Sequence, residues 1–64
     1  MNNEALEKAE TLDDAYVALG KPLPPTADRA TEYARLGLGE ATLYSGTAEQ
    51  NAKYLAALKA EAQK

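Results

Sequence analysis

Apolar side chains recur every three or four residues along three stretches of the chain, which is the spacing of one face of an α-helix. This pattern predicts helices at about residues 4–19, 27–44 and 48–62. The repeating positions are Ala5, Leu6, Ala9, Leu12, Ala15, Tyr16 and Leu19 in the first stretch, Ala30, Tyr33, Ala34, Gly37, Ala41 and Tyr44 in the second, and Ala48, Ala52, Leu55, either Leu58 or Lys59, and Ala62 in the third.

Two glycines interrupt the central stretch and leave two interpretations of it. Each glycine inside a helix costs about 1 kcal/mol relative to alanine. The pattern favours one helix over residues 27–44, kinked where Gly37 and Gly39 occur. The alternative is a helix that stops at Leu36, with Gly37 as its left-handed cap and a new turn near Gly39.

The first stretch also has two interpretations. Thr11 and Asp14 match the capping signature, in which a hydroxyl is followed three residues later by an acid. The stretch is therefore either one helix over residues 4–19, or a frayed turn followed by a helix over residues 12–19. Gly20 is well placed to end either one.

Two breaks separate the predicted helices. Residues 21–25 contain three prolines, which cannot continue a helix and favour a stiff, extended connection. We expect Leu23 to pack into the core from this connection. The second break precedes Thr47, which forms a capping box with Gln50 and so starts the third helix. Because this break is short, we expect the third helix to return antiparallel to the central one.

The composition suits tightly packed helices. The hydrophobic residues are mainly fourteen alanines and nine leucines, which favour helix over sheet. We expect residues 1–64 to form one all-α domain, either a small three-helix bundle or a hairpin of the second and third helices with an acidic first helix packed across it. A core with so few large side chains often borrows surface from a partner or a second copy.

No residue pattern meets the needs of catalysis, cofactor binding or metal binding. Histidine and cysteine are absent, which removes the usual general base and the thiolate ligands of zinc. The Gly37–Gly39 pair lacks the third glycine of a dinucleotide-binding loop, and Asp13 and Asp14 lack the alternating ligands of a calcium loop. Ser45 has no histidine to activate it. We therefore expect a protein that is not an enzyme and has no cofactor.

Charge and hydropathy narrow the choice of partner and location. The net charge of −3 argues against direct binding to nucleic acid, whose backbone is anionic. No stretch approaches the roughly 18 apolar residues of a membrane span. The first ten residues are acidic and lack the apolar core of a signal peptide, so we expect a cytoplasmic protein without a membrane partner.

The negative charge is concentrated in the first stretch. Residues 1–20 carry five acids and one base. On a helix over these residues, Glu7, Glu10 and Asp14 would lie on one side, because they are three and four residues apart. The plain interpretation is a solvated helix face. The sharper interpretation is a docking face for a partner with a basic surface.

A second candidate surface lies on the central stretch. Tyr33 and Tyr44 are three helical turns apart, so a continuous helix would place them on one face. Gly37 and Ala41 would form a smooth strip between them. One interpretation places the two rings at the edge of the core, with their hydroxyl groups in water. The other makes the four residues a partner-binding surface, since tyrosine is enriched at the centres of interfaces.

These observations predict a small acidic protein–protein interaction module, which is an adaptor, inhibitor or regulator of a larger protein and docks through its helix faces. The alternative is a self-associating structural or assembly subunit that uses the Tyr33–Gly37–Tyr44 face. Either role fits a bacterial or phage accessory protein. Both interpretations rest on surfaces rather than on a reaction.

Overall fold

A computed structural model describes residues 3–63, and these residues form four α-helices and one short 3₁₀ helix. The elements in chain order are α1 (Asn3–Lys8), α2 (Leu12–Leu19), α3 (Thr26–Arg35), η1 (Ala41–Leu43) and α4 (Ala48–Ala62). No strand occurs in this part of the chain. The expected all-α fold is therefore confirmed.

The first predicted helix is two helices, so the prediction of a single helix over residues 4–19 is wrong. The alternative is confirmed for residues 12–19, because Thr11 caps α2 and its hydroxyl oxygen accepts a hydrogen bond from the backbone N–H of Asp14 at 3.2 Å. The frayed turn that it placed before this helix is instead the helix α1. The break folds α1 back against α2. Gly20 ends α2 in the left-handed conformation, with φ of 73°, as predicted.

The central helix is not continuous over residues 27–44. It ends at Arg35, and Gly37 follows with φ of 78°. The Gly37 N–H donates to the carbonyl of Ala34 at 3.0 Å, and the Leu38 N–H donates to that of Tyr33 at 3.3 Å. This pair of bonds is a Schellman motif, which satisfies carbonyl groups that a helix end leaves free.

The chain then folds back on itself. Gly39 has φ of 148°, a backbone conformation that residues other than glycine rarely adopt. A Cβ there would lie 3.6 Å from the Tyr33 ring, which is an ordinary van der Waals distance, so the backbone conformation is what favours glycine. After this turn, η1 packs on α3 and brings Tyr44 against Tyr33. The glycines therefore terminate the helix and reverse the chain instead of smoothing a helix face.

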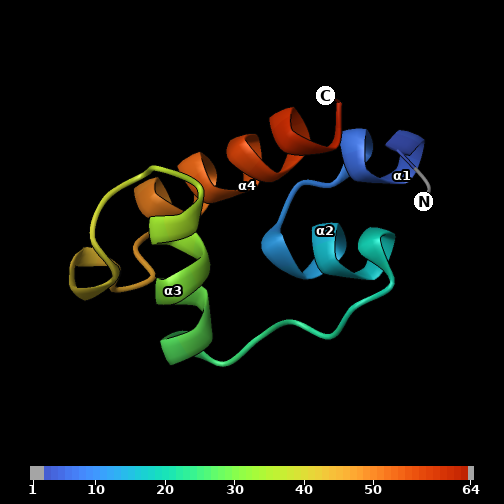
Figure 1. The fold of residues 1–64 in the computed structure, drawn as a ribbon. Coiled ribbons are helices and arrows are strands. Elements are labelled where there is room, and N and C mark those ends of the chain that lie inside the picture. The colour runs from blue at the N-terminus through green and yellow to red at the C-terminus, as the bar shows by residue number, and fades with distance from the viewer. Residues whose placement is uncertain (1–2, 64) are drawn as a thin grey trace.

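Helix α4 begins as predicted, with both bonds of the capping box between Thr47 and Gln50 present. It packs on α1 and α2, whereas α3 packs chiefly on η1. The expected antiparallel hairpin of the second and third helices is therefore not the main packing. Figure 1 shows α1 and α2 at one end of the molecule, α3 and η1 at the other, and α4 between them. The proline-rich link crosses from α2 to α3, with Leu23 partly buried against the core as expected.

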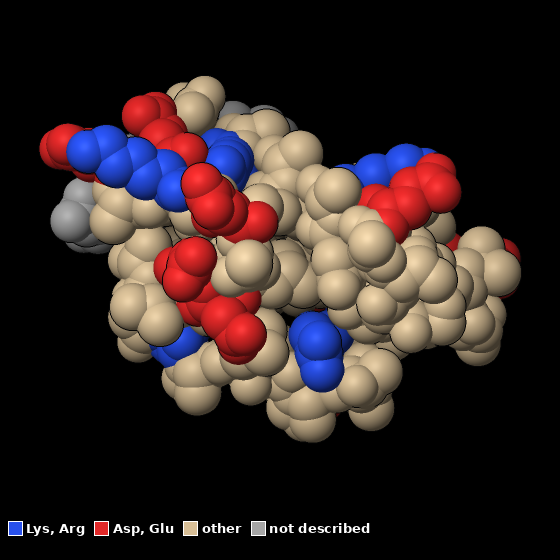
Figure 2. All heavy atoms as spheres, turned by 180° about the vertical axis from the view of Figure 1, so that it is seen from behind, with Lys and Arg blue, Asp and Glu red and all other residues tan. Residues whose placement is uncertain are grey.

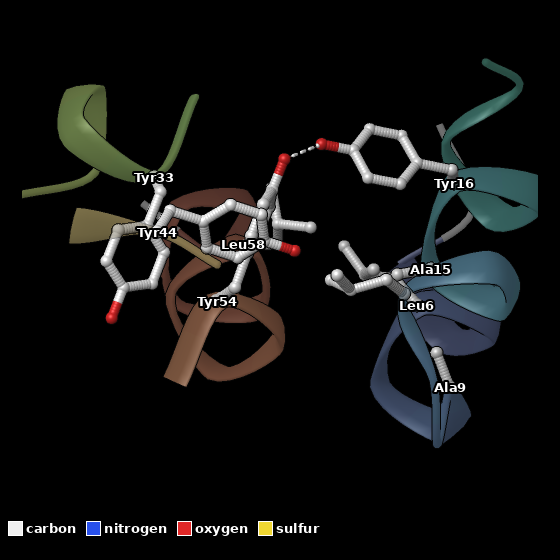
Figure 3. Close-up of a cluster of buried hydrophobic side chains, with 9 residues drawn as sticks. Leu6, Ala9, Ala15, Tyr16, Tyr33, Tyr44, Tyr54 and Leu58 are labelled. Atoms are coloured by element: carbon white, nitrogen blue, oxygen red, sulfur yellow. Dashed lines mark hydrogen bonds between the residues drawn. The ribbon is translucent and has the colours of Figure 1, made fainter. Parts of the chain in front are cut away.

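The core combines alanines and leucines, most of them from residues 6–15, with four tyrosines (Figure 3). The Tyr54 side chain is fully buried, and its hydroxyl group shares a hydrogen bond with that of Tyr16. The buried hydrophobic residues are Leu6, Ala9, Leu12, Ala15, Tyr16, Tyr33, Tyr44, Tyr54 and Leu58. This core ties the two ends of the molecule to α4.

Candidate functional site

The three predicted docking acids are exposed, but they do not share one helix. Glu7 lies in α1, Glu10 lies in the connection, and Asp14 lies in the first turn of α2. The prediction of a single helical face is therefore wrong, since the chain breaks between the first and the third of them. Figure 2 shows acidic side chains gathered on the half of the molecule that contains α1 and α2, with basic side chains among them.

One of these three acids, Glu7, also has local partners. The Gln63 side-chain amide donates to the Glu7 carboxylate at 3.2 Å, and the Lys59 ammonium donates to the Glu7 carbonyl oxygen at 3.1 Å. These bonds fasten α1 to the last turns of α4. Asp14 lies in the first turn of α2, where negative charge suits the helix dipole. Part of the acidity thus stabilises the fold.

Other acids at this end lack a basic partner. Within residues 3–63, Glu10, Asp13 and Asp14 form no ion pair, whereas Glu4 pairs with Lys8 at 3.1 Å. All of these side chains are exposed. The end of the molecule formed by α1 and α2 therefore presents unpaired carboxylates to solvent. We call the exposed surface formed by Glu7, Glu10 and Asp14 the acidic surface.

The predicted tyrosine surface is not assembled. The Tyr33 and Tyr44 side chains are only 4% and 6% exposed, and their ring centroids are 5.1 Å apart in the core. Their shared position comes from the turn after α3, not from a common helix face. Gly37 and Ala41 are exposed, but the rings that were to flank them point into the core. The Tyr44 hydroxyl donates to the Asn51 side chain at 2.7 Å instead of facing open water.

A cleft of about 680 Å³ lies between α2, the proline-rich link, α3 and the end of α4. Its apolar lining comes from three of these segments, for example Leu19, Pro24 and Leu58. Its charged lining is Lys21, Asp28, Glu32, Arg35 and Glu61. The volume falls within the usual range for ligand sites. The lining is mixed, because five of its eleven residues are charged. We call this feature the link cleft.

Arg35 bridges two helices at the edge of the link cleft. Its guanidinium donates to both carboxylate oxygens of Glu61, at 2.8 and 2.9 Å, and also to the carboxylate of Glu32. The hydrogen bond to Glu32, and to a smaller extent that to Glu61, raises the pKa of Arg35, so the guanidinium stays charged. The bidentate pair with Glu61 joins α3 to α4. Together, Glu32 and Glu61 are two of the three carboxylates that line the link cleft.

The floor of the link cleft includes Tyr16, whose hydroxyl group meets that of Tyr54 in the core. Burial raises the pKa of Tyr16 and of Tyr54, so both phenols stay neutral at ordinary pH. A neutral phenol pair offers neither a base nor a strong nucleophile. Among the described residues, no group of three or more acidic, histidine or cysteine side chains could hold a metal ion.

Sequence reasoning missed the link cleft because its residues come from four separate segments. Two signals were present. Asp28, Glu32 and Arg35 are four and three residues apart, which places them on one face of α3. The prolines of the link cannot continue a helix. Pro22 and Pro24 line the link cleft, and neither residue has a backbone N–H group.

The fold defines a small all-α protein with a tyrosine-rich core. Comparison with protein-family models, curated proteins and solved structures finds no match to the chain. Within residues 3–63, no helix has the length and apolar character needed to cross a lipid bilayer.

Proposed function

We propose that this protein is a non-enzymatic module that binds a larger protein and regulates or assembles it. The observation that carries the proposal is the acidic surface, where exposed carboxylates have no basic partner within the described chain. Unpaired charges of one sign favour encounter with a surface of the opposite sign and suppress other partners. The partner should therefore present a basic patch.

The proposal assigns the binding role to Glu7, Glu10 and Asp14. Their side chains are exposed, and α1 is fastened to α4 through Glu7. A surface held in place by packing and hydrogen bonds loses less conformational entropy on binding than a free tail does. This support favours docking on a preformed surface over folding upon binding.

The experiment measures binding to a fluorescently labelled decalysine peptide by anisotropy at several salt concentrations. Replacing Glu7 and Glu10 by Gln and Asp14 by Asn should weaken binding about tenfold, because each exposed charge pair contributes about 0.5 kcal/mol. The salt dependence of the affinity should become shallower in this variant. Circular dichroism of the variant checks that it remains helical.

The matched control replaces Glu40 and Glu49 by Gln, since both are exposed and lie outside α1 and α2. It should weaken binding less, per charge removed, than the first variant. Equal losses would mean that only net charge matters, and the acidic surface would then have no special role. An affinity that is independent of salt would also contradict the proposal.

Self-association through the Tyr33–Gly37–Tyr44 face gains no support from these contacts, because both rings are already buried in the core. That alternative stays a prediction. The most exposed large hydrophobic side chains, Val17 and Leu43, lie on α2 and η1 at opposite ends of the molecule. Isolated apolar side chains of this kind are normal on monomeric proteins.

A further inference from the structure

The link cleft is a second surface, and it lies beside the acidic surface on α2, which contributes Tyr16 and Leu19 to its lining. Its lining does not include Glu7, Glu10 or Asp14. We propose that it binds a short segment of a partner protein that carries leucine-like side chains next to a lysine or arginine. The apolar side chains would enter between the proline-rich link and α4. The cation would pair with Asp28 on α3. This inference does not depend on the role proposed for the acidic surface.

The apolar part of the link cleft consists of its floor and one wall. Leu58 and Tyr16 are almost fully buried, and Leu19 and Ala62 are partly buried against the core. Prolines form the facing wall, and they offer no N–H group at those positions. Such a surface gains by covering apolar area and does not offer a β-strand edge. It therefore suits side chains more than an added strand.

The charge of the link cleft selects the rest of the occupant. Three carboxylates face two cations in the lining. Arg35 is shared between Glu32 and Glu61, so those carboxylates already have a cation. Asp28 forms no ion pair within residues 3–63. Lys21 likewise forms no ion pair in this part of the chain, so the selection rests on the net charge of the lining, three carboxylates against two cations. This net charge of −1 favours a positively charged group, and Asp28 is the carboxylate available to pair with it.

The first experiment titrates the isotope-labelled protein with the acetylated, amidated pentapeptide Gly-Leu-Leu-Lys-Gly and follows backbone amide signals by NMR. Saturable shifts are expected at Leu19, Asp28 and Leu58, which come from three different walls of the link cleft. A peptide with Glu in place of Lys should bind about fivefold more weakly. A peptide with Ser in place of both Leu should give no saturable shifts.

Two pairs of variants then locate the site. Ala62→Trp should fill the link cleft and abolish binding, whereas Ala60→Trp adds the same bulk at an exposed position on α4. Asp28→Asn should weaken binding about threefold, and Glu40→Gln should leave it unchanged. Circular dichroism and urea unfolding check the fold of each variant. If Ala62→Trp does not fold, the second pair decides.

Several outcomes would overturn the inference. One is equal binding by both tryptophan variants. Another is equal binding by Asp28→Asn and Glu40→Gln. A third is a set of shifts confined to residues 4–14 that disappears when Glu7, Glu10 and Asp14 are replaced by amides, which would assign peptide binding to the acidic surface alone. Conversely, loss of binding in Asp28→Asn with full binding in that triple variant supports the link cleft, whatever the acidic surface does.

Discussion

Tyr54 is the residue at which the two ends of the core meet. It is fully buried, and its ring centroid lies 6.3 Å from that of Tyr16, 6.2 Å from that of Tyr33 and 6.0 Å from that of Tyr44. The chain contains no phenylalanine or tryptophan, so these rings supply its aromatic packing. The cost of using tyrosine is a buried hydroxyl group, which Tyr54 satisfies through Tyr16.

This pair predicts that the protein loses stability in alkali. Burial raises the pKa of both phenols above the ordinary value of 10.0, so the folded protein keeps protons that the unfolded chain releases. The unfolded state then binds fewer protons, and the free energy of unfolding falls as the pH rises above about 10. Below that pH, the contribution of the pair is fully present.

Urea unfolding at a series of pH values from about 8 to about 11 measures the effect. The double variant Tyr16→Phe/Tyr54→Phe removes both phenols and should show a shallower decline than the natural protein. At neutral pH each single variant should lose about 1–3 kcal/mol, since it leaves one hydroxyl group without its partner. A double variant that declines as steeply as the natural protein would refute this account.

Among the elements, the connection between η1 and α4 depends on one side chain. The Gln50 amide oxygen accepts hydrogen bonds from the backbone N–H groups of Ser45 at 2.8 Å and Gly46 at 3.1 Å. Its amide nitrogen donates to the carbonyl of Leu43 at 2.7 Å. Gln50 is also the third residue of the capping box with Thr47. It therefore joins the start of α4 to the turn that returns Tyr44 to the core.

Gln50→Ala should lower the free energy of unfolding by about 1–2 kcal/mol, because several backbone groups of the turn lose their partner at once. Thr47→Ala should cost about 1 kcal/mol, since it removes only the hydroxyl cap. Glu49→Gln is the control, because Glu49 is exposed and pairs only with Lys53 among the described residues. Chemical denaturation of all three variants measures the order, and a Gln50 variant as stable as the control would contradict this role.

At the scale of the whole molecule, α3 is the least firmly attached helix. It packs mainly on η1, whereas α1, α2 and α4 pack on one another. It is held to α4 by the Tyr33 ring against Tyr54 and by the bridge from Arg35 to Glu61. A helix with few long-range contacts opens at a lower free energy than the rest of the structure.

Arg35→Gln should therefore speed amide hydrogen exchange in α3 more than in α4. The change removes the bridge and leaves the carboxylates of Glu32 and Glu61 near each other without a cation. The difference from the natural protein should shrink at high salt, because these side chains are partly exposed and their repulsion is screened. Uniform acceleration of exchange in both helices would show that Arg35 stabilises the whole fold instead.

The sequence by itself determined the local signals. Thr11 with Asp14 and Thr47 with Gln50 are capping pairs three residues apart, so each can be recognised without knowing the fold. Gly20 is also a local signal, because glycine readily adopts the left-handed conformation that ends a helix. The all-α class followed from the spacing of apolar residues, because that spacing reflects the helix itself. The break at Thr11 could also be recognised from its capping signature, but the apolar positions continue across it and favoured one helix.

Only the tertiary structure decided the end of the central helix and the two surfaces. Gly37 and Gly39 permit both a kinked helix and a chain reversal, with a helix penalty of about 1 kcal/mol each. The reversal avoids this penalty and also buries Tyr44 against Tyr33, and burying a large apolar side chain contributes about 1.5–3 kcal/mol. The link cleft depends on segments far apart in the chain, so no local pattern could reveal it. Capping acts between neighbours, whereas burial and clefts depend on which distant segments meet.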